Sequence, residues 1–293
     1  SPQDVTDWFE PTINVLKDLA VRGLPIAVRA RQILAARFRG MWWRTNSREL
    51  LSDVMGMIAD RSFWSEGWIA VRSAIRFAPE GADVGDLAAI EERLRPKNLL
   101  EQARAYGFSK GHASQDLEDL DEDEEGSWWH RAEKRTEQIA QAVAIDDEVR
   151  IQLLPDLVRS GLQRHWSFGT GLALGAVDPE AVWHELVREL RSALPDDPEP
   201  AVLRSFLGGW FTRAPEVVET VLDQLLHDPE LGRWFPFFQT AIHPFNPSGV
   251  VRLLASLDLG IAPSGAYHPL VYGRVTDGLE PADFARLLQS IAA

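Results

Sequence analysis

An internal repeat in the second half of the chain constrains the fold more than any other feature of the sequence. Four eight-residue segments align without gaps, and their first residues are prolines that lie 36, 32 and 34 positions apart. An apolar residue stands three positions after each proline and a leucine seven positions after it. Offsets of three and seven place these side chains on one face of a helix, and proline fits a first helical turn because that turn needs no N–H donor. The segments are 179–186, 215–222, 247–254 and 281–288.

The repeat predicts helical hairpins that stack on one another. Asp178 and Asn246 stand directly before two of the prolines, where their side chains can cap a helix N-terminus. Each repeat helix follows another apolar helical segment, so the unit is a hairpin of about 34 residues, and one hairpin cannot bury its own apolar face. The preceding segments are expected at 162–174, 200–212, 230–241 and 267–277.

Hairpins of this length and pattern resemble HEAT or armadillo-type repeats, and the resemblance covers roughly residues 147–293. It implies an α-solenoid fold and a binding role, and it assigns no active site. The wider pattern is also similar to the helical-repeat regions of large bacterial multidomain proteins, including signalling NTPases. We therefore expect the chain to be one region of a longer protein.

The rest of the chain also has helical periodicity and almost no strand signals, so the fold class is predicted as all-α. The segment 116–125 has eight acidic residues among ten, and such a density of like charge favours a solvated loop. The predicted organisation is a helical N-terminal region, 1–107, an acidic loop or linker, 108–126, and a helical-repeat region, 127–293. Within 1–107, helices are expected at 11–22, 25–44, 47–60, 64–78, 84–94 and 98–106.

Composition limits the classes of function. The net charge is −14, whereas nucleic-acid binders usually carry a basic excess. The chain has no cysteine, so disulfides and thiolate metal sites are excluded. No signal peptide and no apolar run of about 20 residues is present. We expect a cytoplasmic location and no membrane partner.

Motifs with a known chemistry do not register. Residues 107–111 match the G-x-S-x-G pattern but follow a predicted helix, whereas a nucleophile elbow follows a strand. The glycine-rich run 169–175 has the wrong spacing for a dinucleotide-binding turn, and we expect its small residues to let two helices approach closely. Neither an EF-hand nor an H-E-x-x-H motif is complete. The sequence therefore predicts no catalytic residue, metal site or cofactor.

The most suggestive local feature is the segment 21–48, which has seven arginines and no acidic residue. The residues expected to form a binding surface are Arg29, Arg37, Trp42, Trp43 and Arg44. Guanidinium groups beside indole rings suit contacts with carboxylates, phosphates and bases. An alternative is that these arginines pair with acidic neighbours of the same chain, such as 116–125.

Three functions remain open from the sequence. The first is a non-catalytic scaffold or regulatory region that binds a protein or peptide. The second is a nucleic-acid binder or an enzyme similar to the HEAT-like DNA glycosylases, which use a basic groove with aromatic residues and a carboxylate. Arg29, Arg37, Trp42 and Trp43 could line such a groove, although the net charge departs from that pattern and no catalytic Asp is assigned. The third is a structural spacer or oligomerisation arm.

Overall fold

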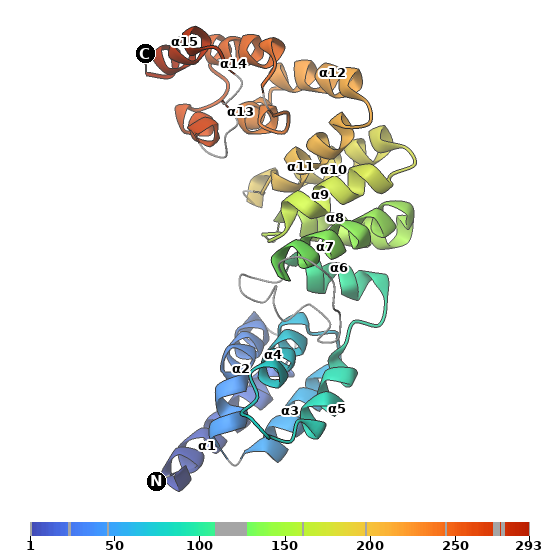
Figure 1. Cartoon of the computed structure of the whole chain (residues 1–293), viewed down its shortest axis with the longest axis vertical. Helices are drawn as coiled ribbons and strands as arrows, with labels where there is room; N and C mark the ends of the chain where they lie inside the picture. The colour runs from blue at the N-terminus through green and yellow to red at the C-terminus, as the bar shows by residue number, and fades with distance from the viewer. Residues whose placement is uncertain are drawn as a thin grey trace. The chain divides into compact units, whose positions relative to one another are not determined.

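The computed structural model describes residues 2–22, 25–45, 47–108, 128–159, 161–196, 198–243, 245–271, 276 and 279–292 (Figure 1). In this part of the chain the regular structure consists of helices, without any strand, and the predicted all-α class is confirmed. No described helix combines the length and the apolar character that a bilayer span requires. The chain divides into two units, Ser1–Arg135 (unit 1) and Thr136–Ala293 (unit 2).

The division between the units falls inside helix α7, Trp128–Ile145. Helix α6 ends at Phe108, and the remainder of the acidic segment predicted as a loop lies outside the described residues. The division into 1–107, 108–126 and 127–293 therefore stays a prediction.

Unit 1 buries its apolar side chains in one core to which α1 to α6 all contribute. Helix α2 packs against α1 and α4, and α5 packs against α3 and α4. The core includes the aromatic side chains of Phe38, Trp42, Trp64 and Trp68. The helices of this unit before α7 are α1 Pro2–Ala20, α2 Pro25–Arg44, α3 Arg48–Ala59, α4 Ser65–Arg76, α5 Gly85–Leu94 and α6 Leu99–Phe108.

Helix α1 corrects the predicted start at residue 11. The helix begins at Pro2 and continues through Pro11, which lies inside it. Phe9, Ile13 and Leu16 all pack on the core of unit 1, and their spacing of four and three residues is that of one helical face. This continuous apolar stripe keeps the chain helical across Pro11, although the proline removes one backbone hydrogen bond.

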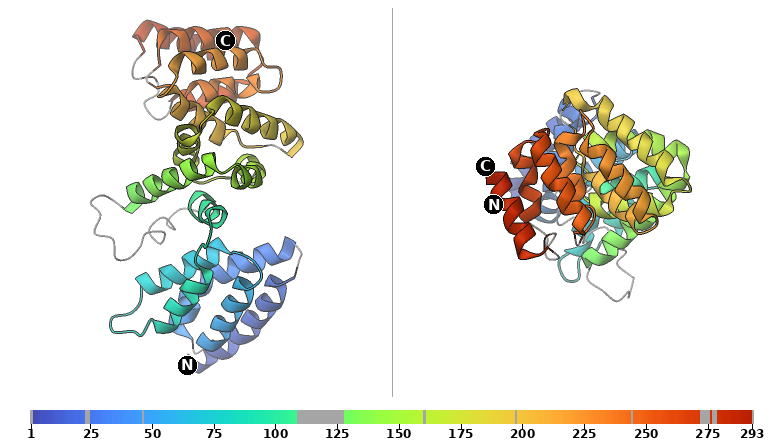
Figure 2. Two further views of the ribbon diagram at one scale, coloured as in Figure 1. Left: turned by 90° about the vertical axis from the view of Figure 1, so that its right-hand side faces the viewer. Right: turned by 90° about the horizontal axis from the view of Figure 1, so that it is seen from above.

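The helices of unit 2 follow one another in chain order along the unit, as the colours show from green to red (Figure 2). Helix α9 packs against α11 and α11 against α13, whereas α8 packs against α10 and α12 against α14. Contacts of α10 and α12 with α11 join the two rows. The elements after α7 are α8 Asp147–Arg159, α9 His165–Gly175, α10 Pro179–Ser192, η2 Leu194–Asp196, α11 Ala201–Phe211, α12 Pro215–Leu226, η3 Gly232–Trp234, α13 Phe235–Gln239, α14 Pro247–Leu259, η4 Ser264–Val271 and α15 Pro281–Ala292.

All four repeat prolines begin helices, namely α10, α12, α14 and α15. The two predicted caps are confirmed, because the Asp178 carboxylate accepts the Ala181 N–H at 3.1 Å and the Asn246 side-chain oxygen accepts the Gly249 N–H at 2.8 Å. The leucines seven positions after the proline are fully buried in α10 and α12, at Leu186 and Leu222.

The most buried position shifts by one residue in the last two repeat helices, since in α14 Leu253 is fully buried and Leu254 only half-buried. Leu288 is 44% exposed, and the neighbouring Leu287 is buried instead. Leu288 borders an apolar hollow of about 340 Å³ between α15 and η4. The predicted inward position of Leu288 is therefore wrong, because α15 turns Leu287 rather than Leu288 into the core.

Two of the expected apolar helices are shorter or of a different type. The segment predicted as a helix over 230–241 consists of the 3-10 turn η3 followed by α13, which restarts at Phe235 with Pro236 in its first turn. Of the segment predicted at 267–277, the part up to residue 271 belongs to the 3-10 helix η4, Ser264–Val271, with Pro269 inside it, and residues 272–275 and 277 lie outside the described residues. Proline lacks the N–H donor and clashes with the preceding turn, which disfavours a continuous α-helix through Pro236 and through Pro269.

Arginines form ion pairs between neighbouring segments of unit 2; Arg150 and Arg252 are buried, whereas Arg159 and Arg191 are exposed. The Arg150 Nε on α8 lies 2.8 Å from Glu185 on α10. The Arg252 Nε on α14 lies 2.6 Å from Asp223 on α12, and Arg252 also pairs with Glu219. Two further arginines, Arg159 and Arg191, pair with Glu189 and Asp228.

Close backbone contacts in α9 confirm the packing role expected for its glycines. A Cβ atom on Gly169 would lie 2.6 Å from the backbone oxygen of Val202 in α11, and one on Gly209 would lie 2.9 Å from Thr170 Cα in α9. Gly171 and Gly175 face α7 in the same way. Glycine is needed at these positions because real Cβ atoms do not approach a backbone so closely.

Candidate binding surface

Helix α2 has a buried face and an exposed stripe. Leu34, Phe38 and Trp42, spaced four residues apart, are buried in the core of unit 1. The opposite face is solvent-exposed, with Ile26 48% and Ile33 37% exposed among arginines. We name this exposed face the α2 stripe, and it consists of Ile26, Arg29, Ile33, Arg37, Gly40 and Arg44.

The structure separates the predicted site residues. Trp42 is only 1% exposed, so it contributes to the core and not to a binding surface. Trp43 is half-buried, and its Nε1 donates a hydrogen bond of 3.1 Å to the Ala74 carbonyl, which fixes the indole against α4. Arg29 lies two turns before Arg37 and donates to Gln32.

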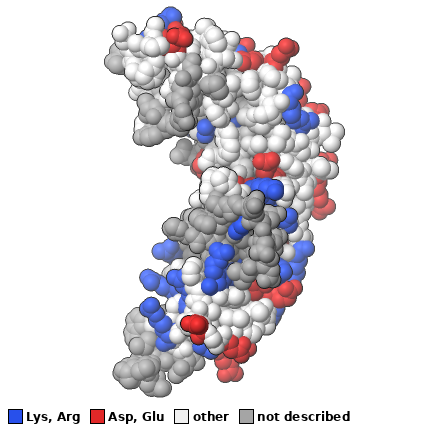
Figure 3. Space-filling model, in the orientation of Figure 1, with Lys and Arg blue, Asp and Glu red and all other residues white. Residues whose placement is uncertain are grey.

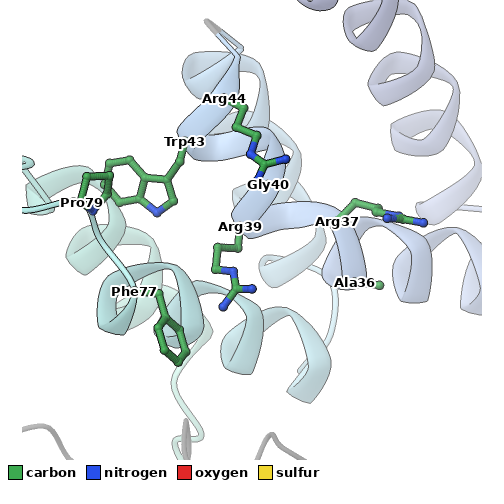
Figure 4. Close-up of a pocket in the computed structure, with 8 residues that line it drawn as sticks. All are labelled: Ala36, Arg37, Arg39, Gly40, Trp43, Arg44, Phe77 and Pro79. Atoms are coloured by element: carbon green, nitrogen blue, oxygen red, sulfur yellow. The ribbon is translucent and has the colours of Figure 1, made fainter.

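Arg37, Trp43 and Arg44 line a common hollow of about 540 Å³, here called the α2–α4 cleft. Figure 4 shows Trp43 beside Pro79, Arg44 extending toward Gly40, and Arg37 pointing away from Phe77. The remaining lining residues are Ala36, Arg39, Gly40, Phe77 and Pro79. The cleft therefore combines three guanidinium groups with two aromatic rings.

Sequence reasoning missed Arg39 and Phe77 as members of this site. The Arg39 Cζ lies 4.9 Å from the centre of the Phe77 ring, and the phenyl group is 50% exposed. The helical spacing from Arg39 to Trp43 (i, i+4) was a usable signal for Arg39. Phe77 offered none, because its place depends on the packing of α4 against α2.

A buried ionic cluster fixes α4, which ends just before Phe77. Glu91 on α5 accepts hydrogen bonds from the Trp68 Nε1 at 2.7 Å and from the Arg72 Nη1 at 3.3 Å, and Arg95 pairs with its other oxygen at 2.8 Å. Burial alone would raise the pKa of Glu91, but the hydrogen bonds from Arg95 and Trp68 and the charges of Arg95 and Arg72 leave the pKa below its ordinary value. The carboxylate is therefore stabilised in its charged form, and it holds α4 and α5 together.

The arginines of the α2 stripe have no acidic partner in the described part of the chain. Within the described residues, no carboxylate pairs with Arg29, Arg37, Arg39 or Arg44. The alternative that these arginines pair with acidic neighbours therefore finds no support in the described part of the chain, and the segment 116–125 lies outside it. In Figure 3 the Lys and Arg side chains of unit 1 gather on its left-hand side, where α2 lies.

The other motifs provide no competing site. Gly107 and Phe108 form the last turn of α6, and the rest of the G-x-S-x-G match lies outside the described residues. The run 169–175 is part of α9. In the described ranges, no group of three or more His, Asp or Glu side chains could hold a metal ion.

Comparisons with known proteins give no match. No protein-family model, no curated protein and no solved structure matches this chain. A proposal for the function must therefore be argued from the residues of the structure and not from a relative.

Proposed function

We propose that the protein is a non-catalytic scaffold whose unit 1 binds an acidic, amphipathic segment of a protein partner. The segment would lie along the α2 stripe, with apolar side chains on Ile26 and Ile33 and carboxylates on the arginines between them. The α2–α4 cleft would take the end of the segment beside Trp43 and Phe77.

One observation carries the proposal, namely that among the described residues Arg29, Arg37 and Arg44 of the α2 stripe have no acidic partner, whereas both buried and exposed arginines of unit 2 have one. In unit 2 Arg150, Arg159, Arg191 and Arg252 all pair with carboxylates of neighbouring helices. Like charges on one exposed face repel one another, and an acidic partner would remove this repulsion. The exposed isoleucines in the same stripe favour a protein partner, because a nucleic-acid backbone offers them no apolar contact.

Nucleic-acid binding is the second candidate, and Phe77 is the observation that favours it. A half-exposed ring beside an arginine can stack on a base. The net charge of −14 opposes this candidate, because phosphate contacts supply most of the affinity of such binders.

Fluorescence anisotropy with the whole chain tests the proposal. The probes are a labelled helical peptide with Glu and Leu on one face, a peptide of equal charge without leucine, single- and double-stranded DNA, and RNA, at about 50 and 200 mM salt. We expect the Glu/Leu peptide to bind best. The double variant Arg37→Glu/Arg44→Glu should weaken this binding about thirtyfold, because two exposed ion pairs are lost and two repulsions are created at roughly 0.5 kcal/mol each.

The matched control is Arg188→Glu/Arg286→Glu, which makes the same change of charge at exposed arginines of unit 2. It should leave the affinity for the peptide unchanged. Tighter binding of DNA or RNA than of the peptide would favour the second candidate, and the absence of peptide binding at low salt would overturn the proposal.

For unit 2 we propose a HEAT-like solenoid as the structural part of the scaffold. Support comes from the four proline-started helices and from ion pairs that join α8 to α10 and α12 to α14. In such arrays each repeat depends only on its neighbours. Removing 247–293 should therefore leave the preceding helices folded with a lower melting temperature, and complete loss of helical signal would contradict the solenoid.

A further inference from the structure

Arg204 occupies an unusual position for an arginine in unit 2. Its Cζ lies 5.3 Å from the centre of the Trp166 ring on α9 and 5.1 Å from the centre of the Phe237 ring on α13. Since Arg204 itself belongs to α11, three helices of one row meet at one guanidinium group. Its Nε is buried without a hydrogen-bond partner, and no carboxylate of the described chain pairs with it.

The charge of Arg204 is desolvated without compensation. The hydrogen bonds that Arg150 donates to Glu185 raise the pKa of Arg150. Burial lowers the pKa of Arg252, but Asp223 and Glu219 raise it above its ordinary value. For Arg204 no such carboxylate among the described residues offsets the burial, which lowers the pKa of its guanidinium. A carboxylate placed against this guanidinium would supply what the other two arginines already have.

The aromatic frame around Arg204 remains open to solvent. Trp166 is 39% exposed, and the exposed His243 ring lies 5.7 Å from the indole. Gly208, one helical turn after Arg204, leaves room for the indole, since a Cβ there would lie 3.4 Å from the Trp166 Cη2 and 3.3 Å from the Ala241 carbonyl oxygen. The indole therefore has a fitted place against α11 and still presents a surface to a ligand.

We propose that Trp166, Arg204, Phe237 and His243 form a carboxylate-binding site that receives a Glu or Asp side chain of a bound peptide. The guanidinium would form a forked pair with the carboxylate, the imidazole could donate one further hydrogen bond, and the exposed indole would cover the apolar residue beside the acidic one. Exposed tryptophan next to arginine is the composition of interface hot spots. This site is in unit 2, and it does not depend on the binding proposed for the α2 stripe.

The geometry favours a peptide carboxylate over two other anions. A phosphate group carries up to two charges and three acceptor oxygens, and it is usually met by a cluster of cations, whereas a single guanidinium matches a single carboxylate. A small free carboxylate would need an enclosed pocket for its affinity, but the rings here lie half-open to water.

Nuclear magnetic resonance of the arginine Nε–H groups in the whole chain tests the site directly. The Arg204 signal is assigned by its absence in Arg204→Gln, and four probes are titrated. The probes are an acetylated Leu-Glu-Leu peptide, its Leu-Gln-Leu counterpart, acetate and inorganic phosphate. We expect the Glu peptide to shift the Arg204 signal at a concentration at least tenfold lower than acetate does, and the Gln peptide to cause no shift.

Two variants separate binding from folding. Arg204→Gln should weaken binding of a labelled Glu peptide about tenfold or more, the range for loss of one charged hydrogen-bonded partner. Trp166 is partly exposed, so Trp166→Ala should weaken binding of the Glu peptide but leave the acetate-induced shift of the Arg204 signal intact. Arg188→Gln on α10 removes an exposed charge from the same unit and should have no effect.

Each other outcome would overturn the proposal. Equal potency of acetate and peptide would indicate a site for small carboxylates, and greater potency of phosphate would indicate a phosphate site. A shift of Arg204 with the Gln peptide, or no shift with any probe, would show that Arg204 does not recognise a carboxylate.

Discussion

Replacing Gly169 by alanine tests how closely α9 and α11, two neighbouring helices of one row of unit 2, must pack. An added Cβ would lie 2.6 Å from both the Val202 oxygen and the Ser205 Cβ, and 2.9 Å from the Phe206 nitrogen. Two of these atoms belong to the backbone of α11 and cannot rotate away. Ordinary contact begins at 3.4 Å, so α9 and α11 would have to separate by nearly an ångström.

The expected cost follows from two opposing effects. Overpacking a tight contact costs up to about 3 kcal/mol. Alanine regains about 1 kcal/mol because it favours the helix more than glycine does. The free energy of unfolding should therefore fall by about 2 kcal/mol in Gly169→Ala.

The matched control is Gly40→Ala in α2, where a Cβ would meet no atom within 4 Å. Here only the helix preference acts, so the free energy of unfolding should rise by about 1 kcal/mol. Urea unfolding followed by circular dichroism measures both changes. If Gly169→Ala stabilised the protein as Gly40→Ala does, the close approach of α9 and α11 would not depend on the absence of a side chain.

Three further predictions concern stability. Because the pKa of Glu91 is lower in the folded than in the unfolded protein, the charged carboxylate stabilises the fold at pH values above the unfolded pKa. This contribution is lost as the pH falls through the folded pKa. Glu91→Gln should therefore remove that part of the pH dependence when the melting temperature is measured at decreasing pH. Arg252→Met should cost about 2–3 kcal/mol in urea unfolding, because Glu219 loses a buried charged partner but stays 22% exposed and can be hydrated; an unchanged value would contradict a structural role of the pair. Asp178→Ala should lower the free energy of unfolding by about 1 kcal/mol because α10 loses its cap, whereas Asp178→Asn should retain most of the stability because Asn can also cap a helix.

Local signals in the sequence were sufficient for most helix starts. Pro179 and Pro247 begin α10 and α14 with the caps that Asp178 and Asn246 were expected to form. Both the proline effect and the cap act within one turn, so they need no knowledge of the rest of the fold. The burial of Trp42 was also readable, because it continues the four-residue spacing of Leu34 and Phe38.

Features that depend on contacts between helices were not readable. Phe77 reaches the α2–α4 cleft only because α4 packs against α2, and Leu287 rather than Leu288 is buried because of how α15 meets α14. Periodicity shows that a helix has an apolar face, but two adjacent leucines differ too little in direction for the pattern to choose between them. The contacts of Arg204 with Trp166 and Phe237 join residues 38 and 33 positions apart and have no local signal.

The ion pairs described between helices of unit 2 have a consequence for synthesis on the ribosome. They join residues that are between 29 and 37 positions apart in the chain. Each arginine therefore meets its partner soon after both have left the exit tunnel, without waiting for the end of the chain. Short loops of this kind close quickly, so the helices of unit 2 can assemble one after another during translation.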